Sequence, residues 1–293
     1  MNYLIILLMI SSLLSSLDAQ SINERIKKIQ KEMIQSLEDI NGTSKETISA
    51  IVNSSFNLRA YKENYFFPLS YRYDGNYLEN GTHETKKEES EYQVSIRYDF
   101  ASDIFGLGEI YSFGYTQRSW WQVYATSAFF RESNYQPELF VKIPTYTFLK
   151  KNPIKGIKLS AIHESNGRGG EYERSWNKLS FSTYIQYKNL ISEFEIWHRL
   201  PDNIDYNPDI EEYLGYGQIK LLLPYNRHLL KATLRANNDF QKGSLELIYS
   251  HPLPTKENND FFLFIKSFNG YGESLIDYNH KVNKISIGVG ISR

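Results

Sequence analysis

The chain has 293 residues, of which 41% are hydrophobic and 23% charged, with 33 Lys and Arg against 34 Asp and Glu. The formal net charge of -1 leaves no basic excess to neutralise nucleic-acid phosphates, and the absence of cysteine excludes a disulfide scaffold, a thiolate zinc site and a cysteine nucleophile. Past residue 20, no apolar run reaches the roughly 18 residues that a membrane helix needs. The 23 Tyr and 17 Phe supply most of an aromatic content of 15%, which favours a membrane β-barrel over a soluble globule.

Residues 1–19 have the pattern of a secretory signal peptide. The apolar stretch at 3–14 is too short to span a bilayer, and small residues follow it toward Ala19, where we expect cleavage. The usual Lys or Arg before the apolar stretch is missing, and a buried N-terminal helix is the alternative. We therefore expect export and a mature chain that begins near Gln20.

Residues 20–57 differ from the rest of the chain, and the sequence predicts a helical or flexible periplasmic extension. Apolar residues recur at spacings of three and four on a charged background, which is the pattern of an amphipathic helix: Ile22, Ile26, Ile29, Met33 and Leu37. This segment contains no recognisable catalytic constellation.

Residues 58–293 predict a 12-stranded antiparallel transmembrane β-barrel. In the clearest strand, at 91–100, aromatic and β-branched residues alternate with polar ones, so that one face meets lipid and the other a polar lumen. An even number of strands suits a closed barrel, which leaves no unpaired edge in the hydrocarbon. The segments lie near 61–73, 91–100, 108–119, 135–149, 154–165, 174–187, 190–200, 212–223, 228–237, 243–251, 261–269 and 280–291.

A soluble lipocalin-like barrel and a β-sandwich are the alternatives for the fold. Strands near ten residues long and heavy use of tyrosine favour the membrane barrel. The chain ends Ile291, Ser292, Arg293, whereas many outer-membrane barrels end in an aromatic residue.

Three polar residues are predicted to meet on the lipid-facing side of one hairpin. In the strand at 154–165, the apolar face continues with the same parity into His163 and Ser165. In the next strand, counting back by two from the outward Leu179 reaches Asn177. Because consecutive strands pair as a hairpin, Asn177 is expected to lie beside His163.

These residue types are the parts of a nucleophilic hydrolase. His163 would accept the proton of Ser165, and Asn177 would hold the imidazole in one tautomer and orientation. A polar side chain that faces hydrocarbon is costly and usually functional. The alternative is that the three residues are merely interfacial, at the end of a strand.

At these residues the sequence resembles the outer membrane phospholipase A family. The resemblance extends over roughly residue 61 to the C-terminus, and its ordered motifs are specific. They are 163–168 (HESNGR) with 174–177 (RSWN), 115–122 (YTQRSWWQ), 130–137 (FRESNYQP) and 270–279 (GYGESLIDYN).

The resemblance implies an outer-membrane barrel of twelve strands that hydrolyses acyl ester bonds of phospholipids and lysophospholipids. Such an enzyme has phospholipase A1 and A2 activity, requires Ca²⁺ and is active as a homodimer. The family's nucleophile, base and orienting amide fall on Ser165, His163 and Asn177.

The family's calcium ligands fall on four positions of this chain. The resemblance implies the backbone carbonyl of Arg168 and, from the second subunit, Ser127. A family serine is replaced here by Glu173, and carboxylate oxygen is a good ligand for calcium. An aspartate ligand would be Asp205, with an offset of one residue from the family pattern.

Gln117 is the residue expected at the dimer interface. It continues the outward parity of Phe113 and Tyr115, so that an amide faces lipid, and pairing with a second barrel would satisfy it. The alternative is a glutamine at the level of the headgroups.

The direction of the strands predicts which way the active site faces. With a periplasmic N-terminus, the fifth strand runs outward, and the catalytic hairpin lies toward the cell surface. The outer leaflet is normally poor in phospholipid, so substrate absence and the monomeric state would both hold activity back.

Two other functions remain open from the sequence. One is a catalytically silent porin or structural barrel that retains the motif, and the other is a surface lectin or adhesin that uses tyrosine-rich loops. Release of fatty acid with calcium, compared with chelator, separates the enzyme from both.

Overall fold

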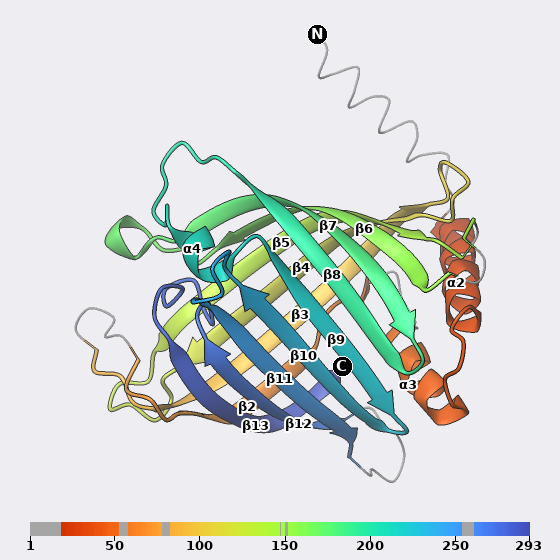
Figure 1. Ribbon diagram of the computed structural model, residues 1–293. Helices are drawn as coiled ribbons and strands as arrows, with labels where there is room; N and C mark the ends of the chain where they lie inside the picture. Colours follow the sequence, from red (N-terminus) through yellow and green to blue (C-terminus); the bar gives the residue numbers. More distant parts are fainter. Residues whose placement is uncertain (1–18, 53–57, 78–82, 147, 150–151, 254–260) are drawn as a thin grey trace.

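The computed structural model describes residues 19–52, 58–77, 83–146, 148–149, 152–253 and 261–293. Almost all of the predicted signal peptide lies outside these residues. The chain forms a tilted antiparallel β-barrel with two helices at one end (Figure 1). Its long strands are β2 (Asn64–Arg72), β3 (Glu88–Ser102), β4 (Ile110–Trp121), β5 (Phe130–Pro144), β6 (Ile154–Ser165), β7 (Ser175–Tyr187), β8 (Leu190–Leu200), β9 (Gly217–Tyr225), β10 (His228–Ala236), β11 (Gly243–Pro252), β12 (Phe262–Gly270) and β13 (Val282–Ser292).

The barrel closes because each long strand pairs with its neighbours along the chain and β13 pairs with β2. A short additional strand, β1 (Leu58–Ala60), pairs with β3 at Ile96–Tyr98, beyond the stretch of β3 that β2 covers. Strands β1 and β2 therefore act as one interrupted barrel strand. The predicted architecture of twelve antiparallel strands with a short helical N-terminal extension is confirmed.

The two faces of the barrel follow the predicted alternation. On β3, Val94 and Tyr98 are 47% and 46% exposed, whereas Gln93 and Ser95, which face the lumen, are buried. The lumen is held together by ion pairs instead of a continuous apolar core. The Nζ of Lys284 lies 2.8 Å from Glu91 Oε2, and the Nε of Arg131 lies 2.9 Å from Glu89 Oε2. Pairing is needed here because an unpaired buried charge is strongly destabilising.

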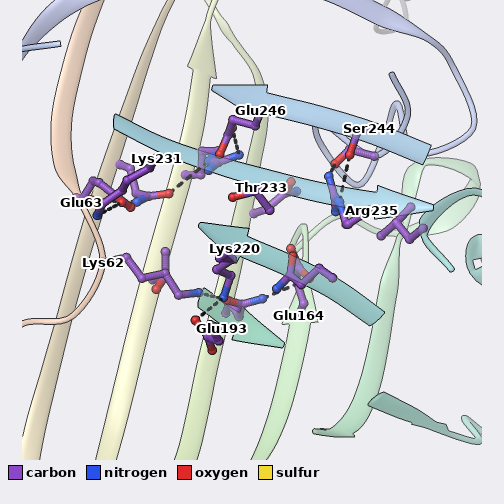
Figure 2. A pocket seen from close by; sticks show the side chains of 18 of the residues that line it. Lys62, Glu63, Glu164, Glu193, Lys220, Lys231, Thr233, Arg235, Ser244 and Glu246 are labelled. Atoms are coloured by element: carbon purple, nitrogen blue, oxygen red, sulfur yellow. Dashed lines mark hydrogen bonds and ion pairs between the residues drawn. The ribbon is translucent and has the colours of Figure 1, made fainter. Parts of the chain in front are cut away.

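A cavity of about 380 Å³ remains inside the barrel. Figure 2 shows charged side chains that meet inside it: Lys231 of β10 reaches across to Glu63, which precedes β2, whereas Lys220 of β9 pairs with Glu193 on the adjacent strand β8. Barrels that conduct as porins have 16–18 strands and leave an aqueous channel. Among the described residues, this lumen is instead crossed by ion pairs, which does not favour the porin alternative.

Two of the predicted strand boundaries were wrong. The segment predicted at 135–149 is β5, which begins at Phe130 and ends at Pro144. The segment predicted at 212–223 begins instead with the helix α4 (Ile210–Leu214), and β9 starts only at Gly217. Ile210 and Leu214 are buried in a cluster with Trp176 and Trp197. Their spacing of four residues makes them neighbours on one face of a helix, whereas in a strand they would share a face but lie about 13 Å apart.

The extension contains the helices α2 (Ala19–Gln35) and α3 (Gly42–Val52), which lie at the end of the barrel away from the β6–β7 turn (Figure 1). The Tyr146 hydroxyl donates to the Ile29 carbonyl (3.0 Å), and the Thr47 hydroxyl donates to the Asn226 carbonyl (2.9 Å). The Gln186 amide donates to a carbonyl between the helices (2.7 Å). The helices are thus docked onto several turns of the barrel. No helix in the described part of the chain is long and apolar enough to cross a membrane.

Truncation of Ile26 is expected to undock α2 without unfolding the barrel. Ile26 is fully buried, and Ile→Ala at such a site costs about 2–5 kcal/mol. Cleavage of a docked segment tracks the population of its open form. Because the lower bound of about 2 kcal/mol corresponds to roughly 30-fold, trypsin should cut α2 of Ile26→Ala about 30-fold faster or more. Gln35→Ala, at an exposed position of the same helix, is the control. Equal cleavage rates in both variants would contradict docking through Ile26.

Candidate active site

The hairpin of β6 and β7 presents the three predicted catalytic residues on its outer face. The register pairs His163 with Asn177 and Ser165 with Ser175. Along the same face Leu159 is 47% exposed, whereas Ile162 points inward and is buried. The alternation predicted from the sequence therefore extends to the end of β6, and the imidazole of His163 is exposed on the lipid side.

One hydrogen bond links the two strands at the site. The Nδ1 atom of His163 lies 2.8 Å from the Oδ1 atom of Asn177. Because a carbonyl oxygen only accepts, this arrangement puts a proton on Nδ1 and leaves Nε2 free to act as a base. The structure thus joins the predicted base to its predicted orienting amide.

Ser165 lies two residues beyond His163 on the same strand face, which corresponds to about 7 Å between Cα atoms. Among the described residues, its hydroxyl makes no hydrogen bond to His163. Catalytic hydrogen bonds are often long without substrate and tighten in the complex. Ser165 therefore lies on the same outer face as His163 and near it, but the two side chains are not hydrogen-bonded in the substrate-free site.

Asp202, which the sequence patterns did not predict, is an acidic residue at this site. The Nδ2 atom of Asn177 donates to the Oδ1 atom of Asp202 at 2.5 Å. Strand β7 lies between β6 and β8, and Asn177 also pairs with Leu200, the last residue of β8. Asp202 follows two residues later. The predicted order of strands contained this signal, because it brings the segment just after β8 next to Asn177.

The turn after Ser165 is fixed by Asn166, which is buried. Its Nδ2 donates to the Tyr172 carbonyl (2.8 Å), and its Oδ1 accepts from the backbone N–H of Arg174 (3.0 Å). Gly167 has φ +64°, and a Cβ there would lie 3.1 Å from the Tyr135 ring. These contacts hold the loop that carries Arg168 and Glu173.

Two of the predicted calcium ligands, Arg168 and Glu173, share that loop. The Arg168 guanidinium forms an ion pair with Glu132 (Nε to Oε2, 3.1 Å). Within the described residues, the Arg168 carbonyl accepts no hydrogen bond, and the half-buried Glu173 carboxylate has no polar contact. Both are oxygen donors, the type that calcium prefers, so these residues fit the ion.

The other two predicted ligands are less well placed. Asp205 is bound to Arg199 (Oδ1 to Nη2, 2.6 Å), so a calcium ion would compete with that ion pair. Ser127 is exposed on a different loop, between β4 and β5. In the described part of the chain, no three His, Asp or Glu side chains gather closely enough to hold a metal.

Gln117 lies on the outer face of β4, as predicted, and is half-buried. Its Oε1 accepts from the Tyr115 hydroxyl (3.3 Å), and its Nε2 donates to the hydroxyls of Ser119 (3.2 Å) and Tyr92 (3.4 Å). One chain therefore satisfies part of the amide's hydrogen-bonding capacity. The amide therefore does not depend on a second barrel for all of its hydrogen bonds.

Fold and site together define a class: a membrane β-barrel with a serine, a histidine and an asparagine gathered on its lipid-facing wall. The model of the phospholipase A1 family matches residues 43–291. The chain belongs to this family.

Individual relatives agree with the family match. A putative phospholipase A1 of Neisseria meningitidis serogroup B is 34% identical over 79% of this chain, a match that covers only 64% of that protein. The Escherichia coli K12 phospholipase A1 is 34% identical over 70% of each chain.

Solved structures show the same barrel. The outer membrane phospholipase dimer of Salmonella typhi with bound calcium is 30% identical and has a TM-score of 0.73, over 84% of this chain and 97% of that one. Outer membrane phospholipase A of E. coli is 31% identical with a TM-score of 0.72, over 81% and 99%. The predicted family and the outer-membrane location are confirmed.

Proposed function

We propose that this member of the family is a calcium-dependent serine esterase that hydrolyses acyl ester bonds of phospholipids and lysophospholipids as a homodimer. The observation that carries the proposal is the hydrogen bond between His163 and Asn177 on the exposed outer face of the hairpin. On this face the ester of a membrane lipid can reach the site without leaving the bilayer. Relatives that are named phospholipase A1 support the choice of substrate.

The first half of the reaction is acyl transfer to the protein. His163 Nε2 takes the proton of Ser165 as its Oγ attacks the ester carbonyl carbon. When the tetrahedral intermediate collapses, the ester C–O bond breaks, and the imidazolium gives its proton to the departing lysolipid alcohol. Asn177 Oδ1 accepts the hydrogen bond from His163 Nδ1–H throughout, which keeps Nε2 directed at the reacting atoms.

The second half regenerates the protein. His163 takes a proton from water, the resulting hydroxide attacks the acyl carbon, and Ser165 leaves with the proton from the imidazolium. The products are a fatty acid and free Ser165. When bound, calcium supplies positive charge that stabilises the oxyanion. Arg168 and Glu173 would hold the ion, together with Ser127 of the partner subunit, while Asp205 would need to leave Arg199.

Orientation and assembly belong to the same proposal. The helical extension lies at one end of the barrel and the β6–β7 turn, next to Ser165, lies at the other, so a periplasmic N-terminus directs the active site toward the cell surface. Gln117 is proposed to lie at the dimer interface, supported by its outward position on β4 and by the dimer known for the Salmonella typhi relative.

Asn177→Ala is expected to weaken hydrolysis less than loss of the nucleophile or base. The variant loses the orienting bond but keeps Ser165 and His163, so kcat should fall on the order of 10- to 100-fold. Fatty-acid release from mixed micelles at saturating calcium measures the effect. Complete inactivity with a correctly folded barrel would contradict a purely orienting role and would give Asn177 a larger electrostatic one.

A further inference from the structure

We propose that Asp202 is a positioning residue, which fixes the orientation of the Asn177 amide and, through it, the tautomer of His163. The inference rests on the proposed function. Two contacts meet at Asn177, since its Nδ2 lies 2.5 Å from Asp202 Oδ1 and its Oδ1 lies 2.8 Å from His163 Nδ1. Together they form a continuous chain from a carboxylate to the catalytic imidazole.

The chemistry of the two ends decides which way the amide faces. An amide can rotate by half a turn and exchange its oxygen and nitrogen at nearly equal cost. An ionised carboxylate only accepts hydrogen bonds, so Asn177 must direct its NH₂ group at Asp202. Its oxygen then faces His163, and the proton must reside on Nδ1. Nε2 is left with a lone pair for the Ser165 proton.

Without Asp202, both orientations of the Asn177 amide become available. In the reversed one, the NH₂ group faces Nδ1, which must then be the acceptor. The proton moves to Nε2, and this tautomer cannot take the proton of Ser165. Asp202 therefore acts by excluding an inactive state of His163. The Asp202 carboxylate also places a negative charge next to the uncharged Asn177 amide, which favours the His163 imidazolium that forms during the reaction.

The fold brings Asp202 to this position by strand order. Asn177 lies on β7 between His163 of β6 and Leu200 of β8, and Asp202 follows at the start of the loop. The carboxylate is half-buried. Its other oxygen, Oδ2, is buried and has no hydrogen-bond partner within the described residues. The Asn177 amide is thus the polar group to which this carboxylate is bound.

The test measures kcat and KM for phospholipid hydrolysis in mixed micelles at saturating calcium. Asp202→Ala should lower kcat about tenfold and leave KM unchanged, because the variant loses both part of the active tautomer population and the negative charge that favours the imidazolium. Asp202→Asn can accept from Asn177 but can also turn its own NH₂ group toward it, so its kcat should lie between those of wild type and Asp202→Ala. Asn203→Ala, at the exposed neighbouring position, should behave as wild type.

A double mutant separates positioning from every other role. If Asp202 acts through Asn177, then Asp202→Ala should cause no further loss in an Asn177→Ala background. Equal losses in both backgrounds, or an unchanged kcat for Asp202→Ala, would overturn the inference. A raised calcium midpoint, or an Asp202→Asn loss equal to that of Asp202→Ala, would also overturn it.

Ser165→Ala in the same series distinguishes the inference from the proposed function. If Ser165→Ala is inactive and Asp202→Ala fully active, only the positioning role fails. If Ser165→Ala hydrolyses lipid at the wild-type rate, the serine mechanism fails, and the role of Asp202 fails with it.

Discussion

Ser165→Ala should reduce phospholipid hydrolysis on the order of 10⁴-fold or more, because alanine has no atom that can form the acyl-enzyme bond. His163→Ala should be similarly inactive, since no other group at the site can take the serine proton. Both residues lie on the outer face of β6 and outside the charged lumen, so the barrel should still fold.

The matched control is Ser175→Ala. Ser175 lies directly across from Ser165 in the register of the hairpin, so this variant removes a hydroxyl from the neighbouring position of the same wall. It should retain most of the activity. Heat-modifiable migration on gels checks that each variant is folded. If the folded Ser165→Ala variant hydrolysed phospholipid at the wild-type rate, Ser165 would be excluded as the nucleophile.

Removal of calcium should abolish activity and favour monomers. A calcium ion held by Arg168 and Glu173 together with Ser127 of the partner subunit, as proposed above, would link calcium binding to dimerisation, so each would strengthen the other. Glu173→Ala removes a carboxylate proposed to bind the ion and should raise the calcium midpoint about tenfold, which corresponds to about 1.4 kcal/mol. Glu171→Ala removes an exposed carboxylate from the same loop and should leave the midpoint unchanged.

Crosslinking and fatty-acid release are measured across one calcium titration for wild type, Glu173→Ala and Glu171→Ala. Dimers and activity should rise together in each protein. Identical midpoints in all three would remove Glu173 from the metal site. Full activity in a monomeric, calcium-free preparation would contradict the link between the ion, the dimer and catalysis.

Period-two alternation was sufficient to predict the barrel and the outward position of His163. It works because a strand has only two faces, and a lipid-facing wall and a polar lumen impose opposite chemistry on them. The same parity, counted through two strands, identified Asn177 as the partner of His163.

The pattern could not predict contacts that depend on three-dimensional closure. Lys284 and Glu91 are 193 residues apart in the chain, and alternation shows that both face the lumen without showing that they pair. Helix α4 was missed because a helix of five residues is shorter than the window that reveals its period. Asp202 lies in a loop, where no periodicity applies, and its role became visible only through the position of Asn177.

Covalent labelling with a sulfonyl fluoride tests the central claim, that Ser165 is a nucleophile activated by His163, most directly. The reagent should inactivate the wild-type protein in proportion to its incorporation, and mass spectrometry of the peptides should find the adduct on Ser165. His163→Ala should incorporate little, because the hydroxyl is no longer activated. Inactivation with Ser165 unmodified, or an active protein whose Ser165 never reacts, would contradict the account.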